Sequence, residues 1–155
     1  MFDFKVVGMG EATTLLNETW PTKTVSVIQE SASFESTGPS HLVIHMSDVD
    51  SSTKSLNAPS PSHLKMILDH TVDLKDGDRL LVNCFAGQSR STAAAIGILI
   101  QHGCDSQTAF DLVLENRGIS FPNTLLIKHI DDHFNLGGQL IKIVSKHNAH
   151  YTTPR

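Results

Sequence analysis

Cys84 and Arg90 are the two residues of this 155-residue chain whose types and spacing most clearly indicate chemistry. They bound the segment Cys-Phe-Ala-Gly-Gln-Ser-Arg, and Ser91 follows directly. A thiol with a pKa of about 8.5 is only about 3% ionised at pH 7, so a nucleophilic cysteine needs groups that stabilise its thiolate. A guanidinium supplies such a charge, and its planar fork can also hold two oxygens of a phosphate. The segment therefore indicates a nucleophile beside an anion site.

The elements on either side of this segment determine where it lies. The nearly continuous apolar run at 79–85 predicts a strand buried on both faces. The run at 91–102, rich in Ala, Ile and Leu, predicts a helix that ends before Gly103. The segment between them would then form a loop at a helix N-terminus, where free N–H groups and the helix dipole favour an anion. We therefore expect the backbone amides of this loop to point at a phosphate.

The Cys-x5-Arg-Ser pattern between a strand and a helix resembles that of the cysteine-dependent protein tyrosine phosphatase superfamily. The short chain is most similar to the small dual-specificity-like and bacterial tyrosine phosphatases. The resemblance extends from about residue 24 to residue 144, and Phe121-Pro122-Asn123 before a predicted helix is similar to the Pro-Asn step of small bacterial members. It implies that Cys84 attacks phosphorus to form a phosphocysteine, that Arg90 binds the phosphoryl group and that Ser91 assists departure of the thiolate.

The residues between Cys84 and Arg90 are the expected substrate-binding residues. Small side chains at three of these positions let the backbone curl so that successive amides turn inward. Phe85 could line the pocket wall or point into the core. The predicted substrate-binding set is Phe85, Ala86, Gly87, Gln88 and Ser89. Because none of them is basic, we expect a singly phosphorylated target, either a phosphotyrosine or a mixture of phosphotyrosine and phosphoserine or phosphothreonine.

Asn83 is a departure from the family pattern, which usually has histidine immediately before the nucleophile. Asparagine can donate a hydrogen bond but carries no charge, so the resemblance implies a less acidic thiol and a slower enzyme. Two other functions stay open at this point. One is a pseudophosphatase that binds phosphate or phosphoproteins with little turnover, and the other is a rhodanese-like sulfurtransferase that carries a persulfide on Cys84.

Phosphoryl transfer to a thiolate leaves an alkoxide or phenoxide that needs a proton from a positioned acid. In the family this acid is an aspartate on a loop that precedes the nucleophile. Here Asp48 and Asp50 both follow the predicted strand at 41–46. Because the carboxyl ends of parallel strands share one edge of a sheet, this segment can meet the Cys84 loop there. We expect Asp48 to be the acid, with Asp50 as the alternative.

Apolar patterns along the chain alternate between strand and helix and predict an α/β fold. We expect a central, mostly parallel sheet of about four to five strands flanked by helices, with a helical C-terminal half. The predicted strands are residues 4–9, 24–29, 41–46 and 79–85, and the predicted helices are 62–72, 91–102, 106–116, 124–134 and 139–146. The helix at 62–72 would be capped around Pro61-Ser62.

Length and composition indicate one domain over residues 1–155, with a core from about 4 to 147 and a flexible tail at 148–155. A net charge of −4 argues against a general nucleic-acid or anionic-lipid surface. We expect no membrane span, no secretory signal and, with only two cysteines, a reduced cytoplasmic setting. The expected partner is a phosphorylated protein or a small phosphomonoester. We expect no metal or cofactor, because the loop itself supplies positive charge.

Overall fold

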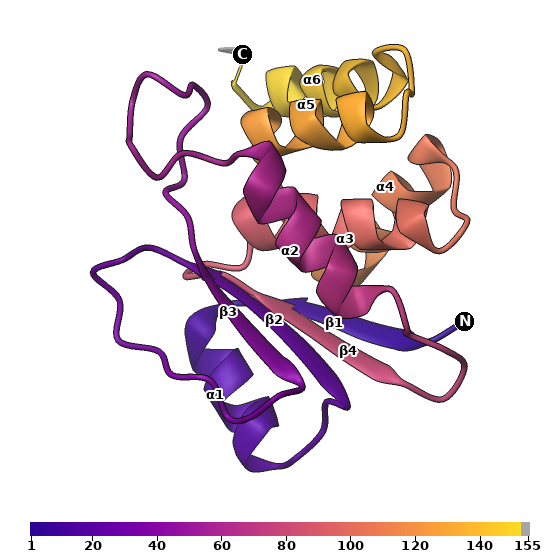
Figure 1. The fold of residues 1–155 in the computed structure, drawn as a ribbon. Helices are drawn as coiled ribbons and strands as arrows, with labels where there is room; N and C mark the ends of the chain where they lie inside the picture. Colours follow the sequence, from indigo (N-terminus) through magenta and orange to yellow (C-terminus); the bar gives the residue numbers. More distant parts are fainter. Residues whose placement is uncertain (153–155) are drawn as a thin grey trace.

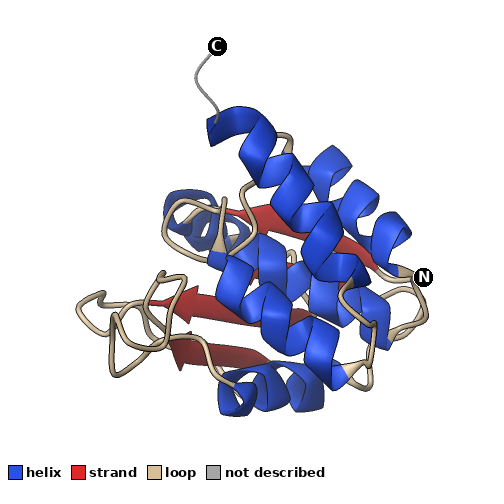
Figure 2. Cartoon of the chain, turned by 90° about the horizontal axis from the view of Figure 1, so that it is seen from above, coloured by secondary structure: helices blue, strands red, loops and turns tan. Residues whose placement is uncertain are grey.

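A computed structural model describes residues 1–152 and has a parallel sheet between two unequal layers of helix (Figure 1). Helix α1 covers one face of the sheet, and α2 to α6 lie on the other (Figures 1 and 2). The strands are β1 (Asp3–Val7), β2 (Lys23–Ile28), β3 (His41–His45) and β4 (Arg79–Asn83). The helices are α1 (Met9–Asn17), α2 (Pro61–Thr71), α3 (Arg90–Gln101), α4 (Ser106–Arg117), α5 (Thr124–His133) and α6 (Gln139–Thr152). The predicted α/β fold with a helical C-terminal half is confirmed.

The sheet of the described residues has four strands in the order β1-β4-β2-β3, and every neighbouring pair is parallel. Strand β4 is central, with β1 on one side and β2 on the other. Its residues after Arg79 are all buried, as the continuous apolar run predicted. Because all the strands point the same way, the segments that follow β1, β3 and β4 leave the sheet at one edge. Gly8, Met46 and Cys84 therefore begin the loops at this edge.

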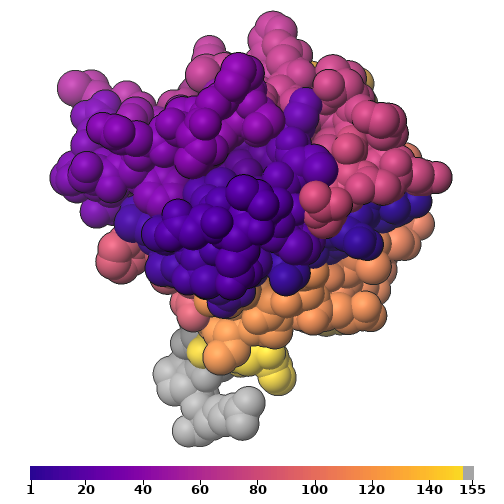
Figure 3. Space-filling view, turned by 90° about the horizontal axis from the view of Figure 1, so that it is seen from below, coloured from indigo at the N-terminus to yellow at the C-terminus, as the bar shows by residue number. Residues whose placement is uncertain are grey.

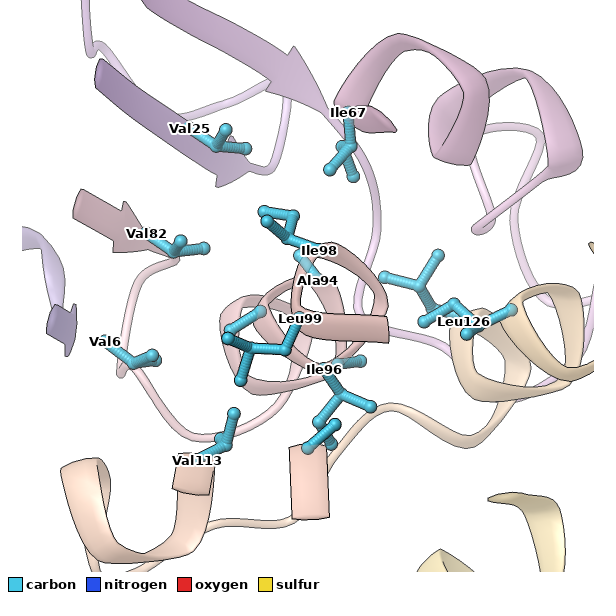
Figure 4. Packing of buried hydrophobic residues seen from close by; sticks show 14 of the residues in the cluster. Val6, Val25, Ile67, Val82, Ala94, Ile96, Ile98, Leu99, Val113 and Leu126 are labelled. Carbon is cyan, nitrogen blue, oxygen red and sulfur yellow. The ribbon is translucent and has the colours of Figure 1, made fainter. Parts of the chain in front are cut away.

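Helix α3 is the centre of the larger core (Figure 4). It is buried from Arg90 to Leu99, which explains its uniformly apolar and small residues. Strand residues cover one side of it and the other helices cover the rest. The surrounding residues labelled in Figure 4 are Val6, Val25, Val82, Ile67, Val113 and Leu126. The helix that follows the candidate phosphate loop is thus held rigidly on all sides.

Helix α1 differs from the predictions, because the apolar pattern predicts that the first strand extends through Met9. The helix begins after Gly8, whose N-cap position provides no side-chain hydrogen bond. Its buried residues Ala12 and Leu15 pack with Val7 and Leu81 in a small second core on this face of the sheet. Figure 3 shows the N-terminal third of the chain, in indigo and violet, covering most of this side. Packing against the sheet therefore stabilises a helix that local signals do not mark.

Two helix boundaries also differ from the predictions. Helix α2 is capped by Ser60, whose hydroxyl accepts from the backbone of His63 in a capping box, and Pro61 is the first helical residue. Helix α6 extends to Thr152, so residues 148–152 of the expected flexible tail are helical. The Tyr151 ring packs against Phe121, with centroids 5.3 Å apart, and this contact holds the last turns. Residues 153–155 of that predicted tail lie outside the described residues.

None of the described helices combines the length and apolar character that a membrane-spanning helix requires.

Candidate active site

The loop between β4 and α3 has its backbone carbonyls directed away from its centre. Five consecutive carbonyl oxygens, those of residues 85–89, each accept a hydrogen bond from a donor outside the loop. The pairs are Phe85 O with Met9 N (2.9 Å), Ala86 O with Arg117 Nη2 (2.9 Å), Gly87 O with Arg117 Nε (2.9 Å), Gln88 O with Phe121 N (2.7 Å) and Ser89 O with Asn123 N (3.1 Å). In a trans peptide the carbonyl of one residue and the N–H of the next point in opposite directions. The N–H groups of residues 86–90 therefore point into the loop, where they form a nest for an anion.

Arg117, at the end of α4, contributes two of these five contacts. Its side chain is half-buried, and its planar fork binds two neighbouring carbonyls in one plane. Nothing in the sequence marks this residue, because an arginine in the last turn of a helix is ordinary. The sequence does not mark Met9 either, because Met9 contacts the loop through its backbone N–H. Only the placement of α4 and α1 beside the loop reveals either role.

Cys84 lies at the start of this nest with its side chain inside the protein, exposed by only 2%. Its Sγ is 3.2 Å from the backbone N–H of Gly87, which donates to it, and 3.1 Å from the Ser91 hydroxyl. Burial alone raises the pKa of the Cys84 thiol, but the Ser91 hydroxyl, the backbone of Ser91 and Ser89, and the Arg90 charge lower it. These interactions outweigh the effect of burial, so the pKa of the Cys84 thiol lies below the ordinary value for cysteine.

Arg90 is also buried, at 4% exposure, although it carries a full charge. One of its terminal nitrogens donates to the carbonyl of Met46 at 2.9 Å, which ties the guanidinium to the end of β3. Within residues 1–152, no protein atom accepts a hydrogen bond from the buried Nε. A buried guanidinium donor costs free energy unless it is paired, so this N–H suits an anionic ligand in the nest.

Asp48 contacts the loop, whereas Asp50 does not. Oδ1 of Asp48 accepts hydrogen bonds from the Ser89 hydroxyl at 2.7 Å and from the Asn123 amide at 2.9 Å. Asp50 instead forms an ion pair with Lys54 at 2.7 Å. The hydrogen bond from Lys54, together with its charge, holds the pKa of Asp50 below the ordinary range. Of the two aspartates, Asp48 is therefore the one that contacts the loop, whereas Asp50 pairs with Lys54.

A hollow of about 340 Å³ lies beside the loop on the side of these aspartates. Ser89 and Asp48 line it together with Phe121 and Asn123, the residues of the predicted Pro-Asn step. Asn123 also caps α5, because its side chain accepts a hydrogen bond from Leu126 N. One short segment thus starts a helix, binds the loop backbone and holds Asp48.

Phe85 does not point into the core, because its side chain is 63% exposed. Ala86 is also exposed, Gln88 and Ser89 are half-buried, and Gly87 is buried against the end of β1. The five predicted substrate-binding residues therefore lie together in one loop, and the N–H groups that point inward are those of residues 86–90.

Comparison with known proteins finds relatives in both sequence and structure. No protein-family model matches the chain. A stretch of 77 residues is 32% identical to Dual specificity protein phosphatase 1 of Arabidopsis thaliana; the match covers 46% of this chain and 39% of that protein. The crystal structure of human DUSP28 aligns with a TM-score of 0.67, 20% identity, and coverage of 88% of this chain and 94% of that chain. The crystal structure of DUSP15 aligns with a TM-score of 0.65, 19% identity, and coverage of 94% and 92%.

These similarities show which proteins the chain resembles. The chain has the fold of the small dual-specificity phosphatases, and its sequence is similar to a phosphatase of that class. The resemblance to the cysteine-dependent protein tyrosine phosphatase superfamily is therefore confirmed. The matched stretch spans well under half of the plant phosphatase, so the activity and substrates of that whole protein do not transfer by similarity alone.

Proposed function

We propose that this chain is a phosphomonoester hydrolase, a protein tyrosine or dual-specificity phosphatase that works through a phosphocysteine and needs no metal. The single observation that carries the proposal is the relation of Cys84 to the loop. A sulfur that receives hydrogen bonds and has a lowered pKa lies at the start of a ring of inward-pointing amides, next to a buried guanidinium with an unpaired N–H among the described residues. This arrangement suits a bound phosphoryl group, because it combines a nucleophile with preorganised positive charge.

In the first step, the Cys84 thiolate attacks phosphorus, the S–P bond forms and the bond from phosphorus to the leaving oxygen breaks. Arg90 and the loop amides stabilise the charge on the three equatorial oxygens. Asp48 gives its proton to the leaving oxygen. Both hydrogen bonds to Asp48 are accepted by Oδ1, which leaves Oδ2 as the oxygen that can carry this proton.

In the second step, water attacks the phosphocysteine and the S–P bond breaks. The Asp48 carboxylate takes a proton from the water, which restores the acid for the next cycle. The Ser91 hydroxyl donates a hydrogen bond to the departing thiolate, consistent with the 3.1 Å separation of Ser91 Oγ and Cys84 Sγ. Hydrolysis of the phosphocysteine thus returns the Cys84 thiolate and inorganic phosphate.

The substrate is a singly phosphorylated side chain, with phosphotyrosine or a mixture of phosphotyrosine and phosphoserine or phosphothreonine as the class. Among the described residues that line the hollow beside the loop, Lys54 is the one cation, and Asp50 neutralises it. A second phosphate would need a counter-charge that this lining does not offer.

Hydrolysis of para-nitrophenyl phosphate by the purified chain tests the proposal. Wild type should release nitrophenol without added metal, and Cys84→Ser should abolish release while still binding inorganic phosphate. Acid quenching during turnover of a radiolabelled aryl phosphate should leave label on wild type and none on Cys84→Ser. Phosphate binding without turnover in wild type would instead identify a pseudophosphatase. Transfer of sulfur from thiosulfate without phosphatase activity would identify a sulfurtransferase.

A further inference from the structure

A row of buried polar side chains crosses three neighbouring strands that lead up to the loop between β4 and α3. His41 begins β3, Ser26 lies in β2 and Asn83 ends β4, and their exposures are 4%, 0% and 0%. Ser26 and Asn83 are direct partners in the parallel pairing of β2 and β4. They lie in an otherwise apolar interior, so each must find hydrogen-bond partners there.

The hydrogen bonds that link these side chains all run in one direction, with each donor on the side of Thr37 and each acceptor on the side of Cys84. The backbone N–H of Thr37 donates to Nδ1 of His41 at 3.1 Å, which makes Nδ1 an acceptor and puts the proton of a neutral ring on Nε2. Nε2 lies 2.8 Å from the Ser26 hydroxyl, which therefore accepts from His41. Ser26 is left to donate its own proton to Asn83 Oδ1 at 2.6 Å. This bond fixes the orientation of the Asn83 amide.

With its oxygen held by Ser26, Asn83 directs its NH₂ group toward the nucleophile. Nδ2 donates to the backbone carbonyl of Cys84 at 3.3 Å. This carbonyl belongs to the peptide that joins Cys84 to Phe85, so the bond restrains the backbone next to the α-carbon of Cys84. The chain of donors from Thr37 thus ends on the residue that carries the sulfur.

We propose that His41 and Ser26 are positioning residues for Cys84: they orient Asn83, which holds the Cys84 peptide so that the sulfur stays beneath the N–H of Gly87 and beside Ser91. The role is indirect, because neither side chain touches the sulfur. Its effect is to keep the two hydrogen bonds that stabilise the thiolate in place. A neutral amide, correctly oriented, then serves where a charged side chain would otherwise be needed. The importance of these positioning residues rests on the proposed function, but the test below measures the ionisation of the Cys84 thiol directly.

The groups around His41 favour the neutral ring that this scheme requires. The edge of the Phe34 ring packs against it with centroids 5.8 Å apart, and His70 on α2 is the titratable neighbour that acts on its charge. Burial, and then the charge of His70, lowers the pKa of His41. The ring therefore keeps one donor and one acceptor nitrogen near neutral pH, as the hydrogen bonds on both sides demand.

The rate of alkylation of Cys84 by iodoacetamide, measured against pH, tests the proposal. A Cys104→Ser background leaves Cys84 as the only thiol. Ser26→Ala and His41→Ala should each raise the midpoint of the alkylation curve by about half a unit or more, a threefold loss of thiolate at low pH. His41→Gln should restore the wild-type midpoint, because its terminal amide can still donate to Ser26. The alkylation rate does not depend on whether the chain hydrolyses phosphate. This experiment can therefore fail or succeed independently of the test of the proposed function.

Ser106→Ala is the matched control, because it removes the same atoms from a buried serine on α4 whose hydroxyl has no partner among the described residues. An unchanged midpoint in Ser26→Ala and His41→Ala, or an equal shift in Ser106→Ala, would overturn the proposal. If the variants do not fold, nitrogen NMR of wild-type His41 decides the matter. A proton on Nε2 is expected, and a proton on Nδ1 would contradict the direction of the whole chain.

Discussion

Gly87 and Val7 lie so close together that no side chain fits between them. A β-carbon at Gly87 would lie 2.4 Å from the carbonyl carbon of Val7 and 2.6 Å from its oxygen. Gly87 also has a φ of +73°, in the region that glycine adopts at least cost. The loop between β4 and α3 therefore rests directly on the end of β1, and its shape depends on a strand far away in the sequence.

Gly87→Ala should disrupt this contact and distort the loop. The positive φ costs about 1 kcal/mol, and the collision with the backbone of Val7 should add about 1–3 kcal/mol. Hydrolysis of an aryl phosphate should fall at least tenfold, because the amides move away from the phosphoryl oxygens. Gly137→Ala is the control, since Gly137 has a φ of +65° with nothing within 4 Å of the added carbon. Equal loss of stability by urea unfolding in the two variants would show that the contact with Val7 does not matter.

Arg117→Lys should weaken the loop although it keeps the charge. Lysine cannot reproduce the paired bonds to the carbonyls of Ala86 and Gly87, so two loop carbonyls lose their donors. We expect kcat/KM for an aryl phosphate to fall by about tenfold to 100-fold, with weaker inhibition by inorganic phosphate. Arg79→Lys, at the opposite end of β4, should leave both quantities unchanged. Wild-type kinetics in Arg117→Ala would contradict the positioning role.

Asp48→Asn should slow the chemical step and remove the fall in kcat at high pH, because an amide cannot deliver the proton. The loss should be about 100-fold for phenyl phosphate and smaller for para-nitrophenyl phosphate, whose leaving group needs less help. Asp50→Asn should keep the wild-type pH profile, since Lys54 holds the pKa of Asp50 low and this carboxyl stays ionised. Loss of the high-pH limb in Asp50→Asn alone would reassign the acid.

The free energy of unfolding should decrease as the pH falls below about 6.5, the ordinary pKa of histidine. Burial lowers the pKa of His41, His63 and His70 in the folded chain, so the unfolded chain binds more protons in this range. This contribution is complete above pH 6.5 and is lost as the pH falls toward the folded values. Urea unfolding at several pH values should show a shallower decline for His41→Gln. The exposed His150→Gln should behave as wild type, and a steeper or equal decline in His41→Gln would be inconsistent with this origin.

The strands could be predicted because burial on both faces leaves long apolar runs, but their ends could not. The predictions carried β3 through Met46 and β4 through Phe85, since both residues are apolar. In the structure Met46 is buried beyond the strand, where its carbonyl accepts from Arg90, and Phe85 is exposed. Apolar character alone does not distinguish a paired strand residue from one that supports a site.

The helices, too, could be predicted only where the sequence itself carries a clear pattern. Helices α2 to α6 could be located from the sequence pattern, whereas α1 could not. Its stability comes from Ala12 and Leu15 packing on Val7 and Leu81, and this contact exists only after β1 and β4 have paired. A nine-residue helix with two adjacent threonines and no side-chain cap gives little local signal.

The segment from Cys84 to Arg90 could be recognised as a candidate site from the sequence alone, because a thiol, small residues and a guanidinium within one strand-loop-helix unit interact locally. Tertiary structure alone decided what holds that segment in shape. Arg117, Met9 and Phe121 reach the loop carbonyls from distant parts of the chain, and Ser26 and His41 reach Asn83 across the sheet. Tertiary contacts likewise distinguish Asp48, which accepts a hydrogen bond from Ser89, from Asp50, which pairs with Lys54. Such hydrogen bonds depend on which strands become neighbours and on how their ends align, and no spacing along the chain records that order.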